Sequence, residues 1–197
     1  MIRPKLIIFA KAPVMGRAKT RLATDIGLVH AQRLYRSMSS RVIRLASGQK
    51  WDTELAITPA HQLGRIPMWD QIVQRPQKSG SLSPRLADVF SAKGPILVIG
   101  TDCPEVNRND ISQAFKALKS HDAVFGPAED GGFWLIGLVG PVRPAIFYNI
   151  RWSSAYTLSD IKSNIGGPIA ELRTLIDVDD GAALANLRSR SRSRSHF

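Results

Sequence analysis

The chain has 197 residues, of which 44% are apolar and 22% are charged, a composition typical of a globular protein with one domain. No apolar run approaches the roughly 20 residues that a membrane-spanning helix needs, and the single cysteine excludes an internal disulfide framework, so we expect a cytoplasmic protein without a membrane span. The net charge is +11, and removing the four arginines of the C-terminal tail still leaves +7, which indicates an anionic ligand.

The hydrophobic patterns predict alternating strands and helices. In chain order, we expect a strand at 6–9, a helix at 29–46, strands at 54–58 and 71–74, a helix capped by Ser83, a strand at 95–100, a helix capped by Asn107, strands at 122–127 and 133–138, a helix after Ser154, a strand at 172–178 and a helix at 181–187. We expect one domain over residues 1–187. The alternating Arg and Ser of residues 188–197 cannot bury apolar surface, which predicts a disordered tail.

This alternation, together with strands that are apolar throughout, favours a three-layer α/β fold around a mainly parallel sheet. Such sheets bind ligands beyond the carboxyl ends of their strands. The candidate functional segments are therefore the loops after Phe9, Ile99, Val124 and Ile176.

The first of these loops, within FAKAPVMGRAKTRL at residues 9–22, is rich in positive charge. Gly16 allows close backbone approach to a diphosphate, and Lys19 and Arg21 supply charge. The segment is not a P-loop, because Ala18 stands where that motif requires a glycine. A solvated basic turn is the alternative, but its position directly after a buried strand favours a phosphate site.

Acidic residues follow two of the other strands. Asp102, after the strand at 95–100, is a candidate ligand for a divalent cation, and the alternative is a cap of the following turn. Asp177 or Asp179 is a candidate second ligand, whereas Asp180 is better interpreted as the cap of the last helix. Cys103 has no histidine nearby in the sequence and is better interpreted as a small buried thiol than as a nucleophile.

Two further features remain open between structural and functional interpretations. Glu129 and Asp130, followed by two glycines, form either a β-turn or a turn that presents a general base. Trp152 is either a core residue or an aromatic surface against which a base or sugar stacks.

Five segments, FAKAPVMGRAKTRLA, LVIGTDCPEV, DAVFGPAEDGGFWLIGL, IRWSS and LIDVDD, occur in an order that resembles a bacterial family of uncharacterised GT-A-type glycosyltransferase-like proteins. Some members of that family are described as arsenosugar-biosynthesis glycosyltransferases. The resemblance extends from about Leu6 to Leu187, and the opening loop is also similar to that of 2-phospho-L-lactate guanylyltransferase.

The resemblance implies the Rossmann-like fold of nucleotide-diphospho-sugar transferases, with Mg²⁺ or Mn²⁺ as cofactor. Its implied partners are a nucleotide-sugar or nucleoside triphosphate and a small-molecule acceptor. The nucleotide would lie against Ala10, Lys11, Pro13, Gly16, Lys19 and Arg21. The metal would lie at Asp102, for which Asp177 and Asp179 are candidate co-ligands, and Asp130 would be catalytic. Gly131, Gly132 and Trp152 would line the acceptor side.

Two departures from the family pattern concern activity more than fold. Ser81 stands where the family has an acidic residue, and Ser83 replaces a glycine. Three functions are therefore considered: glycosyl transfer from a nucleotide-sugar, which we favour; nucleotidyl transfer from a nucleoside triphosphate to a phosphorylated small molecule; and non-catalytic nucleotide binding. Nucleic acid is the least favoured partner.

Overall fold

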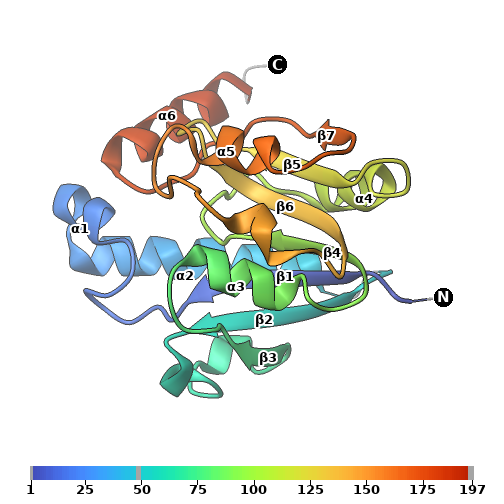
Figure 1. Cartoon of the computed structure of the whole chain (residues 1–197). Coiled ribbons are helices and arrows are strands. Elements are labelled where there is room, and N and C mark those ends of the chain that lie inside the picture. The colour runs from blue at the N-terminus through green and yellow to red at the C-terminus, as the bar shows by residue number, and fades with distance from the viewer. Residues whose placement is uncertain (1, 48–49, 195–197) are drawn as a thin grey trace.

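The computed structural model of the protein describes residues 2–47 and 50–194. Within this part of the chain, seven strands form one mixed sheet in the order β3-β2-β1-β4-β6-β5-β7 (Figure 1). The strands are β1 Lys5–Lys11, β2 Asp52–Thr58, β3 Val73–Pro76, β4 Gly94–Ile99, β5 Ala123–Pro127, β6 Phe133–Gly140 and β7 Ile169–Glu171. Only β6 runs antiparallel to its neighbours, so the carboxyl ends of the other six described strands meet at one edge.

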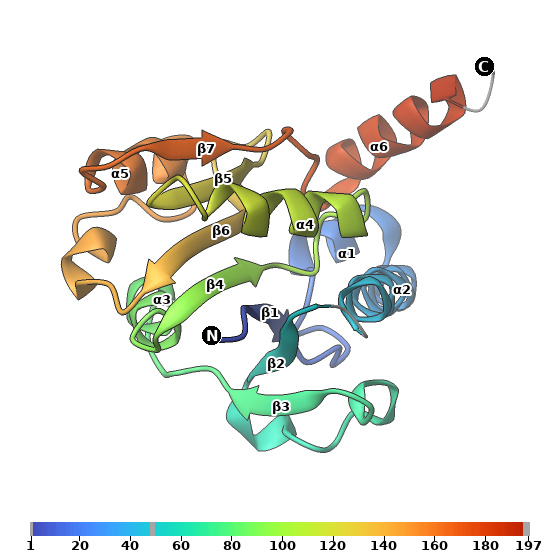
Figure 2. The same ribbon diagram turned by 90° about the vertical axis from the view of Figure 1, so that its right-hand side faces the viewer.

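Helices cover both faces of the sheet, and the predicted three-layer α/β fold is confirmed (Figure 2). The helices α2 Leu28–Ala46 and α4 Arg108–Ala117 pack on one face, and α3 Leu82–Val89 and α5 Thr157–Ser163 pack on the other. Because both faces are covered, β1 is apolar between its two terminal lysines: Leu6 and Ile8 contribute to one core cluster and Ile7 to the other.

Two more helices, α1 Thr20–Ile26 and α6 Gly181–Arg194, join α2 in a third, smaller apolar cluster. Short 3₁₀ segments complete the regular structure at Ala60–Gln62, Pro67–Trp69 and Pro144–Phe147. No helix in the described chain is both long and apolar enough to cross a membrane.

The predicted last strand is misplaced. The structure has β7 at Ile169–Glu171, and residues 172–178 are irregular apart from a single bridge between Leu175 and Ala128. Ile176 and Val178 are apolar because they are buried in the small cluster beside α1 and α6. Their pattern therefore reflects a buried connecting segment and not a strand.

The observed helix starts agree only in part with those predicted from the sequence. The capping box at α4 is confirmed, since Asn107 Oδ1 accepts from Asp110 N at 3.1 Å and Asp110 Oδ2 accepts from Asn107 N at 2.9 Å. The proposed cap by Ser83 is wrong, because α3 begins at Leu82 and Ser83 lies inside it.

The C-terminal helix also extends beyond its predicted end. Residues 188–194, expected to be disordered, continue α6 (Figure 2). Arginine is a good helix former, no Gly or Pro interrupts the segment, and Arg190 pairs with Glu129. The remaining tail residues, 195–197, lie outside the described residues.

Candidate active site

Three carboxylates converge at the carboxyl edge of the sheet. Asp102 follows β4, whereas Asp177 and Asp179 lie in the segment after β7, and one oxygen atom of each lies within 4.8 Å of the others. The Val178 N–H donates to the Asp102 carbonyl at 3.0 Å and so fixes that segment beside the end of β4. The three residues proposed as metal ligands are therefore neighbours.

The ammonium group of Lys19 lies among these carboxylates. Its Nζ is 2.7 Å from Asp179 Oδ1, 3.0 Å from Asp102 Oδ1 and 3.7 Å from Asp177 Oδ1, and the side chain is 5% exposed. Burial alone would lower the pKa of Lys19, but the three negative charges outweigh it and the pKa is raised. The sequence analysis expects Lys19 to contact phosphate, whereas the structure pairs it with the acidic cluster.

The acidic cluster fits a divalent cation. Asp177 Oδ1 is buried and has no hydrogen-bond partner among the described residues. Burial, the main cause, together with the charges of Asp102 and Asp179 raises the pKa of Asp177 to about 7 despite the nearby ammonium of Lys19. When all three carboxylates are ionised, they leave two excess negative charges against the one ammonium of Lys19. Carboxylate oxygens are also the ligands that hard cations such as Mg²⁺ and Mn²⁺ prefer.

One side of the cluster borders a cavity of about 340 Å³ between the ends of β1, β2 and β4. Its lining includes Ala10, Lys11 and Lys19 from the predicted nucleotide set. Pro13 and Gly16 lie outside that lining. A Cβ on Gly16 would meet open space, so its φ of 71° serves the turn and not a close approach to another group.

Tyr35 is a site residue that the sequence analysis missed. Its hydroxyl accepts from the Lys11 N–H at 3.0 Å and donates to the Lys11 carbonyl at 2.7 Å, and Thr101 Oγ1 donates to it at 3.3 Å. Burial raises the pKa of Tyr35 to about 12, which keeps the phenol protonated as a donor. The phenol thus joins the end of β1 to the residue before Asp102. The sequence pattern shows Tyr35 only as another residue on the buried face of α2, so it does not indicate these contacts.

Gln77 and Arg85 were also missed, although they lie on either side of Ser81 and Ser83, the two positions that depart from the family pattern. Gln77 Nε2 donates to the carbonyls of Ala10 and Ala56 at 3.3 and 2.9 Å, and its Oε1 accepts from Arg85 Nη1 at 3.0 Å. Arg85 also lines an adjacent cavity of about 480 Å³ together with Lys11 and Arg17. The nucleotide side is therefore bordered by positive charge.

The other side of the cluster borders a second cavity, of about 650 Å³. Its lining residues come mainly from the β5–β6 turn, the loop before α5 and the acidic segment, and α1 and the start of α3 add one residue each. They include Arg21, Ser81, Asp130, Gly132, Phe133, Trp152, Ser153, Asp177 and Asp179. Arg21, expected to contact the nucleotide, lies on this side. The acidic cluster is thus the boundary between the two cavities.

The β5–β6 turn expected from the sequence is present, and it lies at the second cavity. Asp130 Oδ1 accepts from Gly132 N at 2.9 Å and so stabilises the turn, while the carboxylate lines the cavity. Gly131 has a φ of 86°, and a Cβ there would collide with the backbone of Ala155. Trp152 packs against an apolar core cluster and also lines the cavity.

Two structural interpretations are confirmed near the site. Cys103 is 4% exposed, and burial raises the pKa of its thiol, as expected of a buried residue and not of a nucleophile. Asp180 caps α6, since its Oδ1 accepts from Ala183 N at 2.8 Å.

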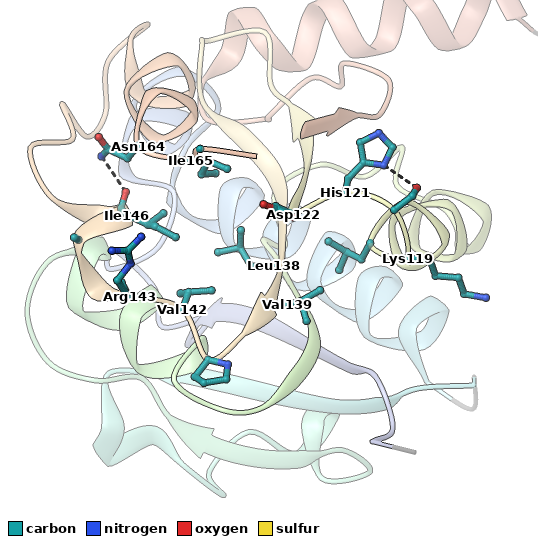
Figure 3. Close-up of a pocket in the computed structure, with 15 residues that line it drawn as sticks. Lys119, His121, Asp122, Leu138, Val139, Val142, Arg143, Ile146, Asn164 and Ile165 are labelled. Atoms are coloured by element: carbon teal, nitrogen blue, oxygen red, sulfur yellow. Dashed lines mark hydrogen bonds between the residues drawn. The ribbon is translucent and has the colours of Figure 1, made fainter. Parts of the chain in front are cut away.

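A larger cavity, of about 940 Å³, lies at the opposite edge of the sheet, between the start of β5 and the end of β6 (Figure 3). Its rim carries Lys119, His121, Asp122 and Arg143. None of the residues predicted for binding or catalysis lines it. The largest of these cavities is therefore not the one at which the predicted site residues gather.

Residues 41–154 match the model of a family described as uncharacterized proteins conserved in bacteria, DUF2064. The chain belongs to this family. No curated protein matches the chain.

Solved structures show the same fold. A candidate nucleotide-diphospho-sugar transferase from Desulfovibrio desulfuricans is 24% identical with a TM-score of 0.83, over 91% of this chain and 84% of its own. The 4-diphosphocytidyl-2C-methyl-D-erythritol synthase of Anaerococcus prevotii is 8% identical with a TM-score of 0.64, over 96% and 98%. Rv0371c of Mycobacterium tuberculosis, solved in complex with manganese, is 15% identical with a TM-score of 0.58, over 94% and 98%. The fold is that of nucleotide-diphospho-sugar transferases.

Proposed function

We propose that the protein is a metal-dependent transferase that moves a glycosyl group from a nucleotide-sugar to a small acceptor. One observation carries the proposal: the acidic cluster of Asp102, Asp177 and Asp179 lies at the boundary of two cavities and contains a buried carboxylate oxygen to which no described residue donates a hydrogen bond. A fold shared with a candidate nucleotide-diphospho-sugar transferase and with a manganese-bound protein supports it.

On the donor side, the nucleotide occupies the 340 Å³ cavity, where Lys11 and Arg85 face its phosphates. Tyr35 holds the backbone of Lys11 in place beneath it. Asp102, Asp177 and Asp179 hold Mg²⁺ or Mn²⁺, which would supply charge neutralisation at the diphosphate.

On the acceptor side, Asp130 is the candidate general base. The acceptor hydroxyl oxygen forms a bond to the anomeric carbon of the sugar, and the bond between that carbon and the diphosphate oxygen breaks. The nucleoside diphosphate leaves with the electron pair of the broken bond, and the hydroxyl proton passes to the Asp130 carboxylate. Gly132 N, which donates to Asp130 Oδ1, orients this carboxylate.

Nucleotidyl transfer is the second candidate function. The adjacent cavity with Lys11, Arg17 and Arg85 adds positive charge of the kind a triphosphate requires, and the erythritol synthase named above has the same fold. Both reactions need the acidic cluster, so the first experiment below tests what they share.

The test is a thermal-shift series with UDP, GDP, dTDP and CDP, each with and without Mn²⁺. At 100-fold excess over its dissociation constant, a bound nucleotide stabilises by about 2.7 kcal/mol. We expect Mn²⁺ to strengthen this shift in the natural protein, and Asp102→Asn and Asp177→Asn each to abolish the enhancement while retaining the fold.

Asp180→Asn is the matched control. Asp180 neighbours the cluster but caps α6, and Asn caps a helix about as well as Asp, so this variant keeps the full Mn²⁺ enhancement. Equal enhancement in the natural protein and in both Asp102→Asn and Asp177→Asn would refute the proposed metal site.

A further inference from the structure

The two cavities differ in their charge. Arg21 is the one cation among the residues lining the acceptor cavity, whereas the nucleotide side has Lys11, Lys19 and Arg85. Arg21 is 76% exposed, and its Nη1 faces Asp179 Oδ2 at 3.9 Å. The acceptor cavity also contains the carboxylate of Asp130. The metal proposed at Asp177 and Asp179 is engaged by the diphosphate of the donor, so a phosphate group elsewhere in this cavity would face the Asp130 carboxylate with only the exposed Arg21 as a cation among the described lining residues.

The polar groups that this cavity offers are hydroxyls and carboxylate oxygens. Ser81 lies at the N-cap of α3 without a side-chain capping bond, and the Ser153 hydroxyl has no hydrogen-bond partner among the described residues. Asp130 uses Oδ1 for the turn, and its other oxygen has no described partner. These groups suit a ligand with several hydroxyls, because each hydroxyl both donates and accepts.

The loop that presents Ser153 is held in an uncommon conformation. Ser153 has a φ of 56°, which is unfavourable for a residue with a side chain. The hydroxyls of Ser154 and Thr157 donate to the Arg151 carbonyl at 2.7 and 2.8 Å, and the Arg151 guanidinium pairs with Asp160 at 2.7 Å. The loop is therefore fixed before a ligand binds, which lowers the entropic cost of binding.

Trp152 adds apolar ring surface to the same cavity. Its Nε1 donates to Ser83 Oγ at 2.9 Å, and Ser83 Oγ in turn donates to the Phe147 carbonyl at 2.7 Å. Because the indole N–H is committed to Ser83, the ring offers the ligand only its apolar carbon surface. Phe133 lines the cavity as a second aromatic ring. Such rings suit the C–H faces of a sugar or polyol.

We propose, building on the proposed function, that the acceptor is a neutral polyhydroxylated molecule of the sugar or polyol class, bound in the 650 Å³ cavity against Trp152. Ser83 is a positioning residue that holds the indole in place. A phosphorylated acceptor, as nucleotidyl transfer to a phosphorylated molecule would require, does not suit the charge of this cavity.

The test uses the protein saturated with Mn²⁺ and with the nucleoside diphosphate that gives the largest thermal shift. Neutral monosaccharides and disaccharides, each paired with its phosphate ester, are titrated by tryptophan fluorescence; D-glucose and D-glucose 6-phosphate form one such pair. We expect at least one neutral member to bind ten or more times tighter than its phosphate. Tighter binding of the phosphate esters, or no binding of any neutral member, overturns the proposal.

Three variants test the residues. Trp152→Leu weakens binding of the neutral sugar at least tenfold. Ser83→Ala weakens it less and makes the tryptophan emission easier to quench with acrylamide, whereas Ser83→Thr restores both properties by keeping the hydroxyl. Arg143→Ala, in the distant cavity, is the control without effect.

The two proposals fail in different ways. Loss of the nucleotide and Mn²⁺ thermal shift counts against the transferase itself. If the thermal shift with nucleotide and Mn²⁺ is intact but phosphate esters bind more tightly than neutral sugars, only the proposed class of acceptor is refuted. Unchanged quenching and affinity in Ser83→Ala would remove the positioning role of that residue.

Discussion

Lys19 shows how one side chain can hold together an active site whose charges would otherwise repel. Three carboxylates with oxygens within 4.8 Å of each other destabilise the fold unless a cation lies among them. The ammonium of Lys19 supplies that charge and is almost fully buried. A divalent cation bound by the same oxygens would compete with it. Lys19 therefore stabilises the protein without metal and opposes the binding of metal.

Lys19→Met separates these two effects. Without the ammonium, the carboxylates are unpaired, so we expect urea denaturation in EDTA to show a loss of roughly 1–3 kcal/mol, less than the roughly 3–5 kcal/mol of a fully buried pair, because Asp179 is 53% exposed. Calorimetric titration should show tighter binding of Mn²⁺ alone. Lys119→Met, on an exposed lysine of the distant cavity, should change neither. Weaker Mn²⁺ binding in Lys19→Met would show that the ammonium supports the metal.

The sequence was sufficient to find the acids but not their partner. Asp102 follows a clearly apolar strand, and the carboxyl edge of a parallel sheet is where ligands bind, so its place was predictable. The three carboxylates that pair with Lys19 lie more than 80 positions away in the chain, so the local sequence around Lys19 does not reveal them. Tyr35 was missed for a related reason. In the sequence, a tyrosine on the buried face of a helix has the same pattern as an apolar core residue, and its hydroxyl contacts cannot be foreseen.

Among the secondary-structure elements, those whose boundaries are set by local chemistry were predicted best. The capping box of α4 depends on side chains three residues apart, and it is present. The expected strand at 172–178 failed because burial beneath α1 and α6, and not sheet pairing, makes that segment apolar. Local sequence patterns therefore located most helices and strands, whereas the conformation of residues 172–178 is set by tertiary packing.

Asn107→Ala should destabilise the protein by about 1 kcal/mol, within the roughly 0.5–2 kcal/mol range of such caps, because two backbone N–H groups at the start of α4 lose their acceptor. Urea unfolding followed by circular dichroism measures the change. Asn107→Asp should stay near the natural stability, since Asp is also a good cap. A loss in Asn107→Asp equal to that in Asn107→Ala would mean that capping is not the cause.

At the scale of the whole molecule, positive charge concentrates at its C-terminal end as well as around the nucleotide cavity. The first part of the helix α6 packs in the small apolar cluster, whereas its later part extends away from the body (Figure 2) and pairs through Arg190 with Glu129, next to Asp130. The sequence predicted the start of this helix but not its extension to Arg194, because a Ser-Arg repeat has no apolar face to indicate packing.

Deletion of residues 188–197 removes that ion pair and four positive charges. Because a surface ion pair contributes only about 0–1 kcal/mol, we expect the deletion to change unfolding stability by no more than this and to leave nucleotide binding intact. Any affinity for a single-stranded oligonucleotide at low salt should fall, since it depends on charge. Oligonucleotide affinity that survives the deletion, measured by fluorescence anisotropy, would instead favour binding by the body of the protein.

The antiparallel β6 divides the sheet into two parts that also follow one another along the chain. Most of the nucleotide cavity is built by residues up to Asp102, and most of the acceptor cavity by residues from Ala128 onward. On the proposed function, mutations in the second half of the gene would therefore alter the acceptor preference while leaving the donor loops intact, so that one preference would evolve without the other. A hybrid of two related proteins, joined within α4, would then take its donor from one parent and its acceptor from the other.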